Sequence, residues 1–308
     1  MLVEEFIIWV FCCVDDYYRR TTIGQTLRSR GFAPALSDAE VITMELVGEF
    51  LGFDADKKIW EYFSHHWMHL FPQLGSRANF AKHAANLWCI KKMIHELIIA
   101  DMGATEEEVH IIDGFPVPVC HYRRSGRSKI FKDVEAATYG YCASKKEKYY
   151  GFEGTIVVTT SGVITGYTFT KPNIEREASF ECTQNIEGIL LGDKGYLGEH
   201  YGEEMKGDGI QVSAPPKENM EDRETPSFRK YLNDTRRKVE TVIGQLVDRF
   251  NISKVRARSL WHLTSRVTRK VLSHTIGMKF LQDRRDNSMA LEYIWHCKSK
   301  CVNASVII

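Results

Sequence analysis

Apolar side chains recur at helical spacing over roughly the first hundred residues of the chain. One helix is well bounded: Ser37 and Glu40 form a capping box at its start, and Gly52 follows its last apolar position. The pattern predicts an all-helical N-terminal subdomain over residues 1–107. Its clearest helices are expected at residues 38–52, 57–71 and 77–97.

The periodicity changes at Val109. A short β-branched run ends in Asp113, and the glycine and two prolines that follow are expected to break the strand. Two strands joined by a turn at Ser161-Gly162 come next, and strands and helices then alternate. The later strands are expected at residues 188–193 and 210–216, and the helices at residues 174–186, 202–206 and 227–252.

This order of segments predicts an α/β fold built on a mixed five-stranded sheet flanked by helices. In a sheet whose first and fourth strands are neighbours, Asp113 and Asp193, which end those strands, would project from adjacent strand ends. The last long helix carries Glu240 and would bring it to the same edge. The apolar face expected for this helix consists of Val239, Ile243, Leu246 and Phe250.

Three carboxylates at one point repel one another unless cations neutralise them. Hard ions that prefer oxygen ligands suit such a cluster, and Mg²⁺ is the default. Two ions about 3.5–4 Å apart would stabilise the attacking and leaving oxygens of a phosphoryl transfer. The sequence therefore predicts a two-metal site formed by Asp113, Asp193 and Glu240.

Residues beside the three acids fit the same chemistry. Lys194 could meet a phosphate, and Arg236 lies one helical turn before Glu240. Gly244 lies one turn after Glu240 and would leave room for a metal or a sugar-phosphate. Taken singly, each feature has an ordinary explanation: a turn at Asp193, an exposed salt bridge between Arg236 and Glu240, and a tolerated glycine.

Composition changes this picture little, because the net charge of the 308 residues is only +1. Charge is segregated, however. Residues 229–270 hold 12 Lys or Arg against 3 Asp or Glu, and residues 122–132 hold five basic residues and no acid. Such clusters are expected on a surface that binds phosphates, although solvated helix faces also produce them. The candidate DNA contacts are Arg123, Arg124, Arg127, Lys129, Lys194, Arg236, Arg237, Lys238, Lys254, Arg256 and Arg258.

Two further regions bear on DNA binding. The helix after Ser76 could enter a DNA groove, with packing or dimerisation as the alternative. Tyrosines also alternate with lysines near residues 139–150, as in proteins that bind single strands. A core or rim position is the alternative for these tyrosines, which are Tyr139, Tyr141, Tyr149 and Tyr150.

The eight cysteines are scattered without paired spacing, and no secretory signal precedes them, which favours reduced thiols in a cytoplasmic protein. The apolar run near the N-terminus covers only nine residues, whereas about 20 are needed to span a bilayer. We therefore expect no membrane association.

Several blocks of sequence carry a family resemblance. They are FCCVDDYYR, IIDGFPVPVC, YGYCASKKEKYYGFEG, LLGDKGYLG, RRKVETVIGQLVDRFNI and VRARSLWHLTSRV. Together they resemble bacterial insertion-sequence transposases of the DDE class, and matching blocks run from about residue 6 to about residue 282. The resemblance implies an RNase H-like catalytic domain over residues 108–282, followed by an extension over residues 283–308 that is disordered or unusual.

By this resemblance Asp113, Asp193 and Glu240 form the DDE triad. The implied activity is metal-dependent cleavage at element ends followed by strand transfer into target DNA, with two Mg²⁺ ions for which Mn²⁺ can substitute. The implied partners are double-stranded DNA, as terminal inverted repeats and target, and a second copy of the chain in a homodimer. A nuclease without strand transfer and a catalytically inactive DNA-binding derivative are the alternatives.

The chain departs from the family pattern around the third acid. Many related elements have a Tyr, Arg, Glu and Lys signature there, and this chain keeps Arg236 and Glu240. It has Asn233 and Val247 where that signature has Tyr and Lys. Arg249 and Lys254 are the candidates to replace the missing lysine.

Overall fold

The computed structural model describes residues 2–24, 33–131, 134, 137–142, 146–172, 174–196, 198–215, 226–284 and 291. Nearly all of the predicted extension over residues 283–308 lies outside these residues. The chain divides into two compact units, one of residues 1–98 with 272–308 and one of residues 99–271. The predicted domain boundary at residues 107 and 108 remains a prediction.

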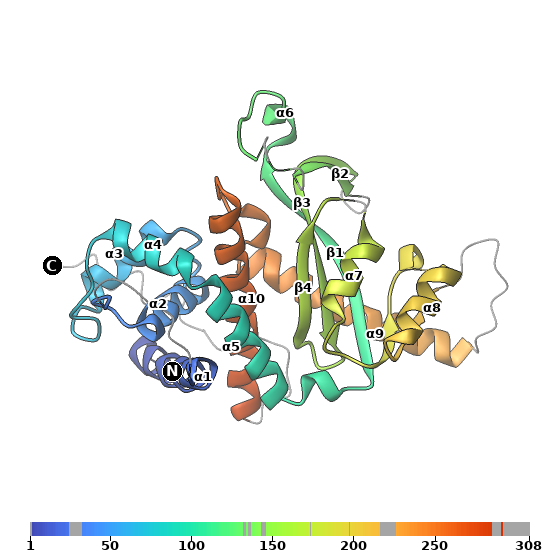
Figure 1. Cartoon of the computed structure of the whole chain (residues 1–308), viewed down its shortest axis with the longest axis horizontal. Coiled ribbons are helices and arrows are strands. Elements are labelled where there is room, and N and C mark those ends of the chain that lie inside the picture. Colours follow the sequence, from blue (N-terminus) through green and yellow to red (C-terminus); the bar gives the residue numbers. More distant parts are fainter. Residues whose placement is uncertain are drawn as a thin grey trace. The chain divides into compact units, whose positions relative to one another are not determined.

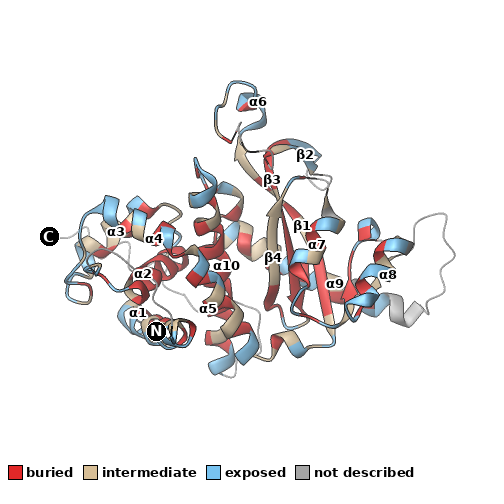
Figure 2. Ribbon diagram, in the orientation of Figure 1, coloured by how far each residue is buried: buried red, intermediate tan, exposed pale blue. Residues whose placement is uncertain are grey.

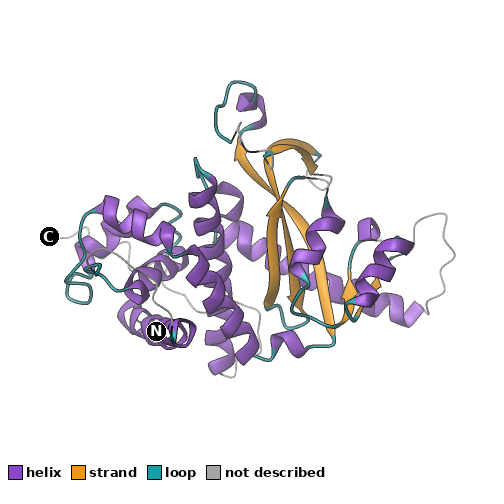
Figure 3. Ribbon diagram, viewed as in Figure 1, coloured by secondary structure: helices purple, strands orange, loops and turns teal. Residues whose placement is uncertain are grey.

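The first unit is helical, as predicted (Figure 3). The capping box is present: the Ser37 N–H donates to Glu40 Oε2 at 2.7 Å, and the Glu40 N–H donates to Ser37 Oγ at 3.2 Å. The helix that it opens is buried on almost every side, and Phe50 at its end packs edge-on against Phe6. The helices at the start of the chain are α1 (Val3–Thr22), α2 (Asp38–Phe50), α3 (Asp56–His66), α4 (Arg77–Asn86) and α5 (Trp88–Asp101).

The single helix predicted over residues 77–97 is wrong, because the chain breaks at Leu87 into α4 and α5. A buried side chain explains the break. Lys91 Nζ donates to the carbonyl of Ala84 at 3.1 Å, which satisfies a carbonyl at the end of α4. It also donates to both carboxylate oxygens of Glu45 on α2, at 3.0 and 2.8 Å. This contact could not be read from the spacing of apolar residues.

Among the described residues, the second unit contains a mixed sheet of six strands. Five of them follow the order β4-β3-β1-β5-β6, in which β1 pairs antiparallel with β3 and parallel with β5. The α/β class, the mixed sheet and the RNase H-like arrangement are confirmed, and the predicted count of five strands was one too few. The strands are β1 (Val109–Cys120), β2 (Thr138–Cys142), β3 (Glu147–Thr159), β4 (Ile164–Thr170), β5 (Gly188–Leu191) and β6 (Ile210–Ser213).

The additional strand is β2. It pairs with residues 147–151 of β3, and β4 pairs with residues 153–158 of the same strand. The hairpin turn predicted between β3 and β4 is present. Gly162 has φ +88°, and the Thr159 N–H donates to the Val163 carbonyl at 2.9 Å across the turn.

The first strand is longer than predicted, because β1 continues past Asp113 to Cys120 in spite of Pro116 and Pro118. Even-numbered residues of β1 direct their backbone groups toward β5, as the bond from the Ile189 N–H to the Glu108 carbonyl shows. The ladder with β5 ends at Ile111 and Leu191. The backbone nitrogens of both prolines therefore face an edge of β1 where no strand among the described residues pairs with it. Their lack of an N–H group costs no hydrogen bond of the ladder.

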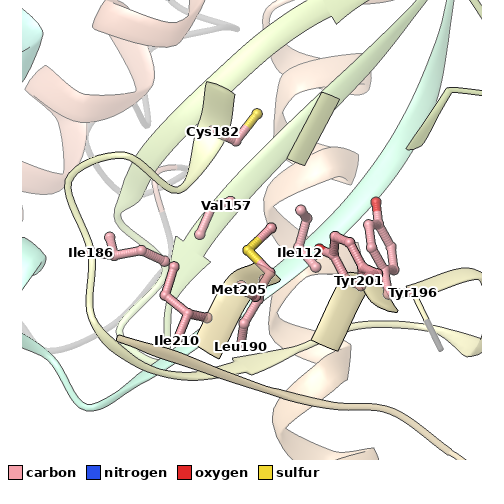
Figure 4. Close-up of a cluster of buried hydrophobic side chains, with 9 residues drawn as sticks. All are labelled: Ile112, Val157, Cys182, Ile186, Leu190, Tyr196, Tyr201, Met205 and Ile210. Carbon is pink, nitrogen blue, oxygen red and sulfur yellow. The ribbon is translucent and has the colours of Figure 1, made fainter. Parts of the chain in front are cut away.

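Helices cover both faces of this sheet (Figure 1). On one face, α7 (Glu175–Cys182) and α8 (Glu199–Gly207) close a core that includes Ile112, Leu190 and Met205 (Figure 4). The opposite face receives α9 (Pro226–Gly244), which contacts β1 and β3. Side chains alternate along a strand, so Asp113 lies on the α9 face while Ile112 lies on the α7 and α8 face. Buried residues are frequent in β3, and they also make up most of α2 in the first unit (Figure 2).

The helix that carries Glu240 is shorter than predicted. α9 ends at Gly244 and continues as one π-helical turn, η3 (Gln245–Arg249). Phe250 follows, and its carbonyl accepts a 2.6 Å hydrogen bond from the buried Lys270 Nζ of α10 (Leu260–Asp283). The predicted apolar face is largely confirmed, but Ile243 is only half-buried and Val242 is fully buried in its place.

No helix among the described residues is long and apolar enough to cross a membrane.

Candidate active site

Asp113 and Asp193 occupy equivalent positions on neighbouring parallel strands. Ile111 and Leu191 form the last pair of the β1–β5 ladder, and each aspartate follows two residues later. The predicted adjacency of these two acids thus comes from strand register. Asp113 does not end its strand, however; it lies inside β1, at the level where β5 stops.

Asp113 is the more buried of the two, and its environment is unusual for a carboxylate. Its pKa is raised from 3.8 to about 6, chiefly by burial and also by the nearby carboxylates of Asp193 and Glu240. The Gly114 N–H, which donates to Asp113 Oδ1 at 2.8 Å, and the Arg236 guanidinium lower it. The predicted triad and Arg236 therefore lie close enough to Asp113 to act on its charge.

Asp193 is exposed in a tight turn that fixes its carboxylate. Its Oδ1 accepts the N–H of Gly195, and its carbonyl accepts the N–H of Tyr196 at 3.1 Å. The glycine before Asp193 has a structural role. Gly192 is buried, and a Cβ on it would lie 2.7 Å from the ring of Tyr196, so its missing side chain makes room for that ring.

Glu240 is exposed near the C-terminal end of α9, one turn after the half-buried Arg236. The ordinary explanation of an Arg236–Glu240 salt bridge is not realised in the part of the chain that the structure describes. A Cβ built on Gly244 meets nothing within 4 Å, so the protein itself does not require a glycine there. The π-helical turn begins directly after it, and such turns are frequent at functional sites.

Within the described residues, no three His, Cys, Asp or Glu side chains already form a metal-binding group. The charges of Asp193 and Glu240 act on Asp113, but among the described residues the three side chains are not arranged as a complete set of metal ligands. Their chemistry nevertheless fits a divalent cation. All three supply carboxylate oxygens, and two of the three are exposed. Burial is the main cause of the raised pKa of Asp113, and the neighbouring carboxylates, whose charge a cation would neutralise, raise it as well.

The predicted DNA contacts fall into two groups. Lys194 adjoins Asp193, and Arg236, Arg237 and Lys238 lie on α9 beside Glu240. Lys254 is the last residue of η4 (Ile252–Lys254), which packs against β1, and Arg256 and Arg258 follow it. All of the predicted DNA contacts are exposed except Arg236.

The second group is distant from the acids. Arg123 and Arg124 lie on the short helix α6 (Tyr122–Ser125), and Arg127 and Lys129 follow it, beyond the far end of β1. Asp113 and Cys120 are seven residues apart in an extended strand, which places them about 23 Å from each other at roughly 3.3 Å per residue. The structure therefore does not bring this basic group to the acids.

The two candidates for the missing signature lysine differ in access. The Arg249 side chain has buried guanidinium nitrogens and lies against the ring of Phe250, whereas Lys254 is exposed. Only Lys254 presents its charge to a ligand without rearrangement. The side chain of Asn233 lies outside the described residues.

Sequence reasoning missed one residue of this site. Arg176, on α7, donates from Nε to the carbonyl of Gly195 at 3.0 Å, and its guanidinium lies 5.9 Å from the ring centroid of Tyr201. It thereby braces the turn that holds Asp193. Its position one residue into a predicted helix gave no signal, because the contact depends on how α7 packs beside the turn.

Comparison with known proteins agrees with this geometry. No curated protein and no solved structure matches the chain. Residues 103–260, just over half of the chain, match the family model of the transposase DDE domain, and the match includes β1, β5 and α9 with all three acids. The chain belongs to the family of transposases with a DDE domain.

Proposed function

We propose that the protein cuts DNA at the ends of a mobile element and joins the freed 3′ ends to target DNA. Asp113, Asp193 and Glu240 are the proposed catalytic acids. The observation that carries this proposal is the environment of Asp113. Burial is the main cause of its raised pKa; the carboxylates of Asp193, from the turn after β5, and of Glu240, from α9, raise it as well, and Arg236 lowers it. Perturbed carboxylates at the edge of a sheet are typical of catalytic sites.

The same three acids would hold two divalent ions, with Mg²⁺ as the first choice. When bound, such ions activate the attacking oxygen and stabilise the leaving oxygen of a phosphodiester. The other residues act on the DNA itself. Arg236, one helical turn before Glu240, and Lys194, next to Asp193, would hold the phosphates that flank the scissile bond. Arg237, Lys238 and Lys254 would extend this contact.

Recognition of the element ends requires base contacts, for which α4 is the candidate. No Asp or Glu lies between Glu61 and Glu96, a segment that contains the whole of α4. Asn79, Lys82 and Asn86 are exposed on one face of this helix, while Phe80 and Ala84 are buried on the other. Amide and ammonium groups on one helical face suit readout of base edges in a major groove.

A homodimer is part of the proposal, because two ends must be held together for joining; this rests on analogy with other transposases.

The test is a reaction of the purified chain with DNA that carries the inverted repeats flanking its coding region, a target plasmid and Mg²⁺. We expect cleaved ends and joined products, and we expect Asp193→Asn to abolish both while binding to end DNA stays within about threefold, since a single isosteric change leaves the phosphate contacts in place. Cleaved ends without joined product would identify a nuclease. Binding without cleavage by the unaltered chain would identify an inactive DNA-binding derivative.

A further inference from the structure

Three large aromatic side chains are exposed together at the end of the sheet that is distant from the acids. Tyr122 on α6 is 41% exposed, and Tyr139 and Tyr141 on β2 are 51% and 56% exposed. Tyr149 and Tyr150 on β3, by contrast, are buried. The structure thus separates the four tyrosines near residues 139–150 into two that support the sheet and two that face solvent.

The exposed rings are held in place. Tyr122 packs edge-on against Tyr139 with 5.8 Å between ring centroids, and Tyr139 packs against Tyr150 at 5.1 Å. These three residues are called the tyrosine column. The hydroxyl of Ser125 donates to that of Tyr139 at 3.2 Å, and the hydroxyl of Tyr150 donates to the carbonyl of Phe131 at 3.4 Å. An exposed ring with this much support loses little conformational entropy when it binds a ligand.

Strand geometry directs Tyr139 and Tyr141 to the same side. They are two residues apart in β2, and their partners across the pairing with β3 are Tyr150 and Lys148. Gly140 between them faces the other side, where a Cβ would overlap the ring of Tyr149. Tyr149 therefore fills the opposite face, and the outer face offers two neighbouring tyrosine rings beside an exposed lysine.

The segment that carries Tyr122 bears charge of one sign. Arg123, Arg124, Arg127 and Lys129 are all exposed, and residues 121–131 contain no Asp or Glu. A surface of aromatic rings edged by cations matches a polymer that has planar bases and a phosphate backbone. Bases in a duplex are already stacked on their neighbours, so rings of this kind can stack only on bases that have left the helix.

We propose that the tyrosine column and Tyr141 bind an unpaired segment of DNA, with bases stacked on Tyr139 and Tyr141 and phosphates held by Arg123, Arg124, Arg127 and Lys148. The proposal rests on the proposed function for the identity of the nucleic acid. The column lies at least as far from Asp113 as Cys120 does, about 23 Å along β1, or roughly seven base pairs at 3.4 Å each. The segment bound is therefore one that has parted from its complement near an element end.

The experiment uses the full chain in EDTA, so that no cleavage occurs, and measures anisotropy of a labelled oligothymidylate and of a blunt duplex of equal length. Stacking contributes about 1–3 kcal/mol per base, so the double variant Tyr139→Ala/Tyr141→Ala should bind oligothymidylate roughly tenfold or more weakly. Duplex binding should change less than threefold. The double variant Tyr139→Phe/Tyr141→Phe keeps both rings and should bind like the unaltered chain.

Tyr231→Ala is the matched control, because Tyr231 is 49% exposed but lies on α9, outside the column. An unchanged affinity of the double alanine variant for oligothymidylate overturns the proposal. An equal loss for duplex, or an equal loss in Tyr231→Ala, overturns it as well.

A second measurement needs no substitution and so does not depend on the folding of a variant. Ultraviolet crosslinking of the unaltered chain to an oligonucleotide with 5-iodouracil should give adducts on Tyr139 or Tyr141, and adducts confined to other peptides overturn the proposal. These assays use no metal and no cleavage. If the cleavage test contradicts the role of the three acids, the results of these binding assays still stand. If the binding assays contradict stacking on the tyrosines, the role of the acids in cleavage is still tested separately.

Discussion

The Arg176 guanidinium donates a 3.0 Å hydrogen bond to the carbonyl of Gly195, two residues after Asp193. The Gly195 N–H, in turn, binds the carboxylate of Asp193. A cation on α7 therefore fixes the turn that presents an acid on the other side of the loop, without itself facing the acids. Arg176 is in this sense a positioning residue.

We expect Arg176→Met to slow DNA cleavage by roughly 10- to 100-fold, since a hydrogen bond from a charged group contributes about 1.5–3 kcal/mol. It should also raise the Mg²⁺ concentration needed for half-maximal cleavage, a readout that loss of stability alone would not change. Arg19→Met, which removes an exposed arginine paired with Asp15 on α1, should alter neither value. An unchanged Mg²⁺ dependence in Arg176→Met would contradict the positioning role.

Neutralising Asp113 should stabilise the protein while it abolishes cleavage. The folded-state pKa of Asp113, about 6, lies above its ordinary value of 3.8, so the folded protein binds the extra proton between these pH values. Stability is therefore lost as the pH rises through this window, and above pH 6 the buried charge costs about 1–3 kcal/mol. Asp113→Asn removes that cost, which corresponds to roughly 2–4 °C in Tm for each kcal/mol.

The measurement is Tm by calorimetry without metal at pH 4 and pH 7.5. The gain from Asp113→Asn should appear only at pH 7.5, and Mg²⁺ should stabilise the unaltered chain more than the variant. Glu203→Gln, a change at an exposed carboxylate on α8, serves as the control and should show no such pattern. A loss of stability at pH 7.5 in Asp113→Asn would refute the electrostatic account of the site.

Substitution of Gly244 tests whether bound DNA lies against the last turn of α9. Because a Cβ there meets nothing within 4 Å, Gly244→Ala should stabilise the protein by about 0.5–1 kcal/mol. If Gly244 leaves room for bound DNA beside Glu240, cleavage should nevertheless fall about tenfold or more, equivalent to 1.4 kcal/mol or more in the barrier.

Gly202 on α8 is the matched control, since it too lies in a helix and a Cβ added to it would meet nothing within 4 Å. Gly202→Ala should stabilise the protein and leave cleavage unchanged. Full cleavage by Gly244→Ala would mean that the glycine is merely tolerated. Urea unfolding and single-turnover cleavage measure the two effects separately.

Acid should unfold the helical unit through two buried histidines. Burial lowers the pKa of His95 on α5 and of His274 on α10 from 6.5 to about 3. Below pH 6.5 the unfolded chain therefore binds protons at these histidines that the folded chain does not bind. The free energy of unfolding is at its full value above pH 6.5 and falls as the pH drops toward 3. Each histidine contributes a slope of up to about 1.4 kcal/mol per pH unit.

Urea midpoints at pH 7.5, 6.5 and 5.5 should show this fall, and His274→Phe should flatten it by about half. His95 Nδ1 lies 3.0 Å from Thr275 Oγ1, so the conservative change at that position is His95→Asn. His200→Gln, at an exposed histidine of α8, should not alter the pH dependence. A stability that does not vary between pH 7.5 and 5.5 would contradict the assignment of both histidines.

Local sequence patterns predicted which helices and turns form better than they predicted where each element begins and ends. The capping box at Ser37 and the turn at Gly162 involve residues close in sequence, and both were predicted correctly. The adjacency of Asp113 and Asp193 followed from strand order alone. The break at Leu87 and the brace from Arg176 could not be predicted, because each depends on a side chain that arrives from another turn or helix.

The length of β1 is the clearest case of a rule that failed for a physical reason. Proline breaks a strand only where its N–H would be needed, and that depends on where the neighbouring strand ends. β5 ends at Leu191, which no pattern around Pro116 and Pro118 could reveal.

Pro116 and Pro118 also disfavour aggregation of the protein. A bare strand edge is a template on which another chain can add a strand, and such additions lead to aggregates. Beyond Ile111 the β5 side of β1 is bare among the described residues, but every second backbone nitrogen in its outer part belongs to proline and has no hydrogen to donate. The strand that carries Asp113 can thus remain open to a substrate while it resists edge-to-edge association with other copies.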